Sequence, residues 1–138
     1  MTPRGRILPD WQPATTPAHR PVTGRTVELI PLDANAHTAD LRDALRDEGL
    51  WTYMGYGPFG SAKAFDEWVR WACSQEATLF WAVCPRSADG TTPAATTPAA
   101  TTPAATTPSR AAGVAAVLRV DEAHGRAEVG HICLGPAL

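Results

Sequence analysis

The sequence predicts an α+β domain in which an antiparallel sheet carries helices. Two apolar runs, at 111–120 and 126–134, flank a charged turn that ends in Gly125, and this is the pattern of a β-hairpin. The second run has apolar residues at both alternating sets of positions, so a strand there is expected to be covered on both faces. Between residues 62 and 74, apolar residues recur at the spacing of an amphipathic helix. These patterns place the hairpin in the middle of a layered domain.

The segment before the hairpin predicts a strand and a helix. Residues 25–32 alternate as a strand does, and Pro31 pushes that strand toward an edge position or an end. Asp33 or Asn35 is expected to cap a helix from about 36 to 47. One face of this helix is apolar apart from a histidine, and it consists of His37, Leu41, Ala44 and Leu45.

A second helix and a further strand follow an aromatic loop. Gly49 is expected to end the first helix, and the loop at 50–60 contains three glycines, a proline and four aromatic rings. The simplest reading is that these rings fill a gap between two helices. The next helix is expected at 62–74 with Ser61 as its cap, and its apolar face is core. A strand at 77–84 completes the order strand, helix, helix, strand, strand, strand.

Two segments fall outside this pattern. Residues 1–23 contain five spaced prolines and predict an extended arm, in which Trp11 either docks onto the domain or remains exposed and mobile. Residues 85–110 carry a TTPAA repeat, whose period fits neither helix nor strand. We expect a low-complexity, PPII-like loop there, inserted between two strands of the domain at 24–138.

Composition narrows the classes of function. A formal net charge of −2 gives no basic surface for nucleic acid or an anionic membrane. Three cysteines without a C-x-x-C spacing indicate neither a disulfide framework nor a zinc site. No stretch is apolar over the roughly 18 residues that a membrane span needs. The expected setting is the reducing cytoplasm.

Four segments, in order, resemble the GNAT superfamily of N-acetyltransferases, in the branch of the ribosomal-protein N-terminal acetyltransferases. The main one is the Glu-Val-Gly-His segment at 128–131, followed by Pro-Ala-Leu at 136–138. The other three are GRTVELIPLD at 24–33, WTYMGYGPF at 51–59 and FWAV at 80–83. The resemblance implies a partial GNAT-like fold that uses acetyl-CoA as co-substrate and acetylates an amine of a protein N-terminus or a small molecule.

The resemblance covers only the N-terminal half of such an enzyme. In the family, a Gly-rich loop that binds the coenzyme pyrophosphate follows the central strand, whereas this sequence ends at Leu138. A chain truncated after its central strand is expected to be inactive and to leave Ile132 and Leu134 on an open edge prone to self-association. Micromolar binding of acetyl-CoA would contradict the expected inactivity.

Two residues on the last strand are the predicted catalytic groups. Glu128 is a candidate base acting through water, or else it pairs with Arg119 or Arg126 across the hairpin. His131 has the intrinsic pKa of a proton shuttle, or else it is a hydrogen-bonded core residue. Strand alternation predicts that Glu128 and His131 point to opposite faces, so they are not expected to touch.

The resemblance also implies binding residues. Pantetheine would hydrogen-bond to the backbone of Ile132, Cys133 and Leu134. The loop between the two helices borders the acceptor groove in the family, and Tyr53 and Tyr56 are the candidates to line it. The sequence predicts no metal ligand.

A different class of function is also open: a non-catalytic module that binds a protein through aromatic and proline-rich segments. The five tryptophans distinguish the two classes. An acetyltransferase fold requires Trp68 and Trp81 in the core, whereas an interaction module would expose them.

Overall fold

The computed structural model describes residues 5–86 and 110–138 and contains one five-stranded antiparallel sheet in the spatial order β1-β2-β3-β4-β5. The expected repeat loop at 85–110 therefore lies outside the described residues, except for its ends. Along the chain the elements are β1 (Val22–Thr23), β2 (Val27–Pro31), α1 (Ala34–Ala44), the 3-10 helix η1 (Glu48–Trp51), α2 (Ala62–Cys73), β3 (Leu79–Pro85), β4 (Gly113–Asp121) and β5 (Arg126–Leu134).

The expectation that four distant segments pair in a single sheet is confirmed. Leu29 of β2 lies opposite Val83 of β3, and Val83 in turn lies opposite Gly113 of β4. Pro31 is the last residue of β2, as its missing N–H predicts. The short β1, which the sequence did not predict, lies within the expected arm and pairs with the other edge of β2.

The two helices begin at side-chain caps. Asp33 accepts a hydrogen bond from the Ala36 N–H at the start of α1, and Ser61 accepts one from the Ala64 N–H at the start of α2. The predicted end of α1 at residue 47 is wrong. Asp47 instead caps η1 by accepting from the Gly49 N–H, so Gly49 lies inside a short 3-10 turn and does not terminate α1.

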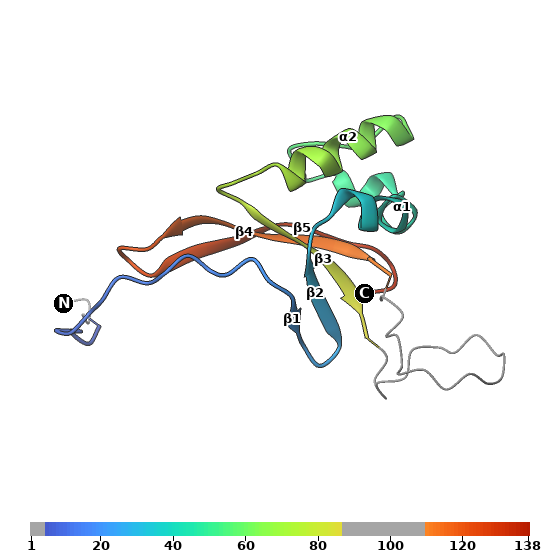
Figure 1. Cartoon of the computed structure of the whole chain (residues 1–138). Helices are drawn as coiled ribbons and strands as arrows, with labels where there is room; N and C mark the ends of the chain where they lie inside the picture. The colour runs from blue at the N-terminus through green and yellow to red at the C-terminus, as the bar shows by residue number, and fades with distance from the viewer. Residues whose placement is uncertain (1–4, 87–109) are drawn as a thin grey trace, which may run out of the picture.

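Both helices lie on the same face of the sheet (Figure 1). The core between these layers is apolar, and its fully buried members are led by Phe80, Leu41, Leu45, Val69 and Val114. Trp68 is 6% exposed and belongs to this core. The expected helical stripe on α2 is confirmed, because Phe65, Trp68, Val69 and Ala72 are all buried.

The N-terminal arm crosses to the tip of the β4–β5 hairpin (Figure 1). Trp11 docks there: its indole N–H donates to the Ala123 carbonyl at 2.9 Å, and the Thr16 hydroxyl donates to the Glu122 carboxylate at 2.7 Å. Further along the arm, His19 packs edge-on against Trp81 at 4.7 Å between ring centroids. The arm therefore supplies the cover for Trp81 that the helices do not.

The expected cover on both faces of the last strand is absent among the described residues. β5 is an edge of the sheet, and β4 is its one strand neighbour in that part of the chain. Val129 is 65% exposed, Ile132 50% and Leu134 43%. The predicted exposure of Ile132 and Leu134 is confirmed. Of the helices in the described ranges, none is long and apolar enough to cross a membrane.

Candidate functional site

A β-bulge interrupts the edge strand at the segment that carries the predicted site. Val114 lies opposite Cys133, but Ala116 lies opposite Gly130, so two residues of β5 face one residue of β4. His131 is one of these two, and its backbone φ of 50° is in the left-handed region. Such a conformation is costly for a residue with a side chain, and it is found where the surrounding structure enforces it, often at functional sites.

This bulge corrects the prediction that Glu128 and His131 point to opposite faces. Ala116 belongs to the core on the helix side, and the paired Gly130 shares its face. Glu128 lies two positions before Gly130, with regular pairing between them, so it is on that face as well. The bulge breaks the alternation and turns His131 to the same side, where its ring lies 5.0 Å from that of Phe80. No contact joins Glu128 and His131 directly.

His131 is held by aromatic side chains from three different elements. The Tyr56 hydroxyl lies 2.8 Å from His131 Nδ1, and the two rings are stacked at 13°. Phe80 of β3 and Trp71 of α2 complete this aromatic box, with Trp71 at 6.5 Å from the imidazole. Burial raises the pKa of Tyr56 to about 12, so the phenol keeps its proton across the physiological range.

Glu128 forms an ion pair across the hairpin, which was predicted as the alternative to its role as a base. Its carboxylate accepts from the Arg119 guanidinium at 2.8 Å, and 48% of its side chain is exposed. Arg126, the other predicted partner, instead binds Asp121 at 2.9 Å. Arg119 also has a backbone φ of 50° and lies at a second register shift of the hairpin.

The aromatic loop divides into a buried part and an exposed part. Trp51 is 3% exposed and packs edge-on against Phe59 and Trp68, so these rings fill the space between the helices, as the simpler reading expects. Tyr56 is half-buried and reaches His131. Tyr53, in contrast, is 98% exposed. Of the two predicted acceptor-binding tyrosines, the structure brings only Tyr56 to the rest of the site.

The three predicted coenzyme-contact residues alternate in exposure along the open edge. Ile132 and Leu134 are half exposed, whereas Cys133 is 3% exposed and faces the core. Burial raises the pKa of the Cys133 thiol, which keeps it a protonated core residue and not a nucleophile. Because β5 has no strand beyond it in the described residues, its outward backbone groups are free to pair with a ligand.

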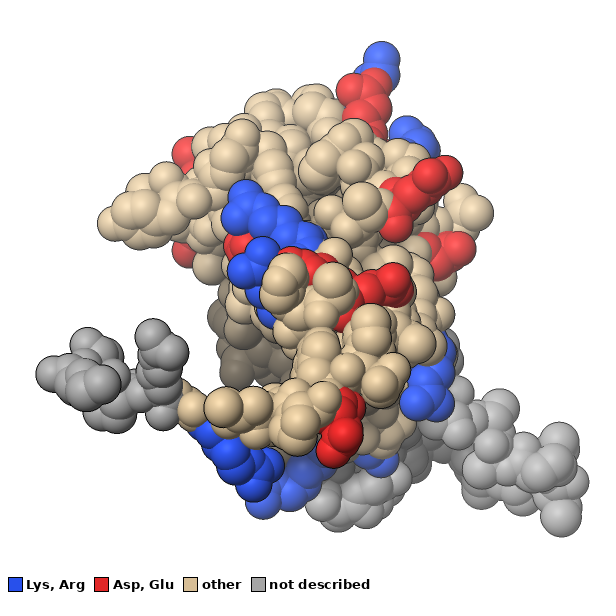
Figure 2. Space-filling view, turned by 90° about the vertical axis from the view of Figure 1, so that its left-hand side faces the viewer, with Lys and Arg blue, Asp and Glu red and all other residues tan. Residues whose placement is uncertain are grey.

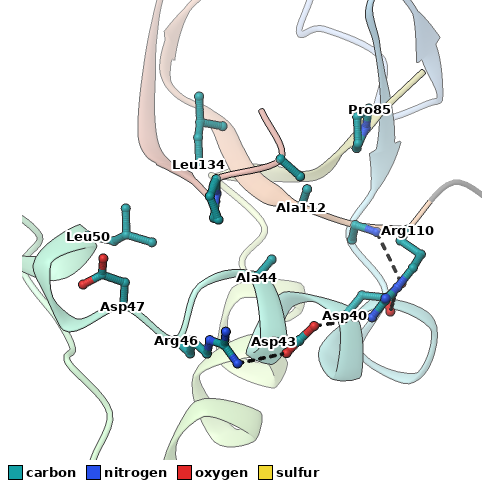
Figure 3. Close-up of a pocket in the computed structure, with 14 residues that line it drawn as sticks. Asp40, Asp43, Ala44, Arg46, Asp47, Leu50, Pro85, Arg110, Ala112 and Leu134 are labelled. Carbon is teal, nitrogen blue, oxygen red and sulfur yellow. Dashed lines mark hydrogen bonds and ion pairs between the residues drawn. The ribbon is translucent and has the colours of Figure 1, made fainter. Parts of the chain in front are cut away.

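A pocket of about 610 Å³ opens at the end of this strand (Figure 3). Leu134 and the following Gly135 line one side, and the last turn of α1 lines the other. Asp40 from α1 accepts from Arg110 at 2.9 Å within it. Carboxylates of α1 thus engage both cations that line this pocket, since Arg46 also pairs with Asp43 at 3.7 Å, and this makes it a poor site for a pyrophosphate as it stands.

On the face seen in Figure 2, acidic and basic side chains are interspersed, so this face presents no uniformly basic surface for a polyanion. Among residues 5–86 and 110–138, no three His, Cys, Asp or Glu side chains come together as a metal site would require.

Sequence reasoning missed the aromatic box and the pocket. Trp71 lies outside the apolar face predicted for α2, Phe80 was predicted only as one apolar position of a strand, and nothing in their spacing indicates that they meet His131. The bulge had one available signal, because Gly130 interrupts a strand and such glycines often mark bulges. Asp40 and Arg110 are far apart in sequence, and only the folded chain brings them together.

Among the solved structures with a similar fold are proteins described as acetyltransferases. One is described as a "probable" acetyltransferase of the GNAT family from Chromobacterium violaceum; it is 28% identical with a TM-score of 0.71, and the match covers 100% of this chain and 60% of that one. Another, a GCN5-related N-acetyltransferase from Brucella melitensis, is 28% identical with a TM-score of 0.74, over 95% of this chain and 52% of that one. The chain thus spans little more than half the length of these proteins. No protein-family model and no curated protein matches the sequence.

Proposed function

We propose that this chain takes part in acetyl transfer from acetyl-CoA to an amine, with the bulged edge of β5 as the coenzyme-facing surface. The GNAT-like fold suggests acetyl transfer in general. The observation that carries the proposal is the open edge itself, where the bulge at His131 interrupts the ladder and Ile132 and Leu134 remain half exposed. Backbone groups on such an edge can pair with the amides of an extended ligand such as pantetheine.

Each predicted residue has a role in this proposal. Acetyl-CoA would supply an activated acyl group for direct attack by the amine. The backbone of Ile132, Cys133 and Leu134 would hold the pantetheine arm. Glu128, next to solvent and paired with Arg119, would take the amine proton through water.

The acceptor is the least defined part of the proposal. Tyr56, which contacts His131, would border the acceptor there, whereas Tyr53 could contribute only from a fully solvent-exposed position. Either a protein N-terminus or a small-molecule amine fits this description. The ribosomal-protein branch and a cytoplasmic setting stay predictions.

Burial of Trp68 and Trp81 favours acetyl transfer over the interaction-module class. Trp68 and Trp81 are each 6% exposed, as the acetyltransferase fold requires, so neither ring is available to a partner. Trp11 is half-exposed, but its indole N–H is already bonded to the hairpin.

Calorimetric titration of the chain with acetyl-CoA tests the proposal, and NMR mapping locates the site. We expect saturable binding that perturbs the amides of Ile132, Cys133 and Leu134, while Ala123 at the hairpin tip serves as the internal control. Micromolar affinity would support the proposal and overturn the expectation that the 138-residue chain is inactive. Absence of binding, or perturbations confined to the tip, would refute the proposal for this chain.

A further inference from the structure

We propose that Tyr56 is a positioning residue that holds His131 as its Nε2–H tautomer, so that His131 acts as a neutral hydrogen-bond donor to the acyl carbonyl oxygen. This inference rests on the proposed function and deepens it. It assigns His131 a role different from the predicted proton shuttle. It also gives Tyr56 a role that acts through the histidine, in addition to the border of the acceptor site proposed above.

The first step of the argument is the fixed position of the imidazole. The bulge places the His131 backbone at a φ of 50°, and the ring then lies between Tyr56 and Phe80 at centroid distances of 5.7 Å and 5.0 Å. Phe80 is 1% exposed and cannot move without disturbing the core. The ring is therefore held on both sides, and Nδ1 is the nitrogen directed to the Tyr56 hydroxyl.

The second step is the direction of the hydrogen bond between Tyr56 and His131. A phenol and an imidazole nitrogen can each donate, so the surroundings of the phenol decide. Burial raises the pKa of Tyr56 to about 12, so the hydroxyl keeps its proton. His131 Nδ1, at 2.8 Å, is the one side-chain hydrogen-bond partner of this hydroxyl among the described residues, and the buried indole N–H of Trp68 donates to no acceptor there. Donation to Nδ1 is therefore the arrangement that uses the phenol proton within the protein.

The third step concerns what His131 can then do. A histidine that acts as a base at Nε2 needs its proton on Nδ1, where a carboxylate or carbonyl normally accepts it. Here Nδ1 accepts from a phenol, so the neutral ring carries its proton on Nε2. No described residue binds Nε2, and His131 is only half-buried, so this N–H is available to a ligand. A neutral imidazole N–H can polarise a carbonyl without transferring its proton.

Long-range ¹H–¹⁵N NMR on the full chain, at a pH where imidazole is neutral, reads the tautomer without any assay of activity. His131→Gln identifies the signals among the four histidines. We expect His131 as a single Nε2–H tautomer in the wild type and as a mixture of tautomers in Tyr56→Phe, which keeps the ring and removes the hydroxyl. Tyr53→Phe is the matched control, because Tyr53 is 98% exposed, and it should leave the His131 signals unchanged.

Several results would overturn the inference. An Nδ1–H tautomer in the wild type would do so, and this measurement decides even if Tyr56→Phe does not fold. An unchanged tautomer in Tyr56→Phe, or an equal change in Tyr53→Phe, would also contradict it.

Acetyl-CoA added to the wild type should shift the Nε2–H signal. Binding seen by calorimetry without that shift would refute the donor role and leave the proposed function intact. Absence of binding would refute the proposed function together with the donor role, while the tautomer measured on the free chain still decides whether Tyr56 positions the ring.

Discussion

Gly135 lies where the end of β5 meets the rest of the fold, and it tolerates no side chain. A Cβ at this position would approach the carbonyl oxygens of Ala44 and Ala112 to 2.6 Å and 2.8 Å. Both are backbone atoms, and the Gly135 N–H already donates to the Ala112 carbonyl at 2.8 Å. The absence of a side chain thus lets the chain after β5 pack between α1 and β4.

We therefore expect Gly135→Ala to destabilise the fold by about 1 to 3 kcal/mol, because backbone must move to admit the methyl group. Gly60→Ala is the control, since a Cβ there meets nothing within 4 Å, and its effect should stay within about 0.5 kcal/mol. Urea denaturation followed by circular dichroism measures both. Equal stability of Gly135→Ala and the wild type would show that this junction is looser than it appears.

At the scale of single residues, the sequence predicts the chemical character of a side chain better than the face of the sheet to which it points. The residue types of Glu128 and His131 indicate acid–base groups, and Arg119 was a foreseen partner of Glu128. Their relative orientation depends on one additional residue in a strand, because a bulge reverses the alternation beyond it. Strand propensities give no signal for such an insertion, so only the folded structure shows which face of the sheet His131 is on.

The start of α1 is an element closed by two reciprocal hydrogen bonds. The Asp33 carboxylate accepts from the Ala36 N–H at 2.8 Å, and the Asp33 N–H donates to His37 Nδ1 at 3.0 Å. This arrangement is similar to a capping box, with an imidazole in place of the usual Glu or Gln. It requires His37 to be neutral, because a protonated Nδ1 cannot accept.

The stability of this element should consequently depend on pH. Burial lowers the pKa of His37, and the carboxylates of Asp33 and Asp40 oppose this only in part. Because the folded pKa lies below the unfolded value of about 6.5, the unfolded chain binds more protons, and stability falls as the pH drops below about 6.5. In His37→Asn, whose amide oxygen can replace Nδ1 as acceptor, we expect a smaller loss between pH 8 and pH 5.5 in urea denaturation.

His124→Gln is the control for that experiment, since His124 is exposed at the hairpin tip and lies outside α1. It should retain the wild-type loss of stability. If His37→Asn and the wild type lose the same stability over this range, His37 is not the group that couples α1 to pH.

Helices were predictable where a single local signal determined where they begin or which face is buried. The start and buried face of α2 follow from Ser61 and the apolar spacing. The end of α1 was not predictable in the same way, because Asp47 can extend a helix or cap a new turn with equal chemistry. Contacts of Trp51, whose indole N–H donates to the Leu45 carbonyl at 3.0 Å, favour the turn.

On the scale of the molecule, the sheet is covered unevenly. Both helices lie on one face, and the arm covers Trp81 on the other, but β5 has no strand neighbour on its outer side in the described residues (Figure 1). The apolar residues on both faces of β5 predicted a central strand. The pattern alone does not show whether the same chain or a second copy covers those residues. The exposed side chains of Val129, Ile132 and Leu134 are therefore a surface that a second copy of the chain could pair with.

We expect the chain to associate reversibly as its concentration rises, and Ile132→Lys to weaken that association by about 1 to 3 kcal/mol, because a paired edge would bury Ile132 and a lysine there disfavours pairing. Ile7→Lys is the matched control: it makes the same substitution at a side chain that is 84% exposed in the arm, away from the edge. Sedimentation velocity over a range of concentrations measures all three proteins. A wild type that stays monomeric throughout would mean that the bulge at His131 already protects this edge from pairing. An Ile7→Lys variant that dissociates as readily as Ile132→Lys would show that the association does not depend on the β5 edge.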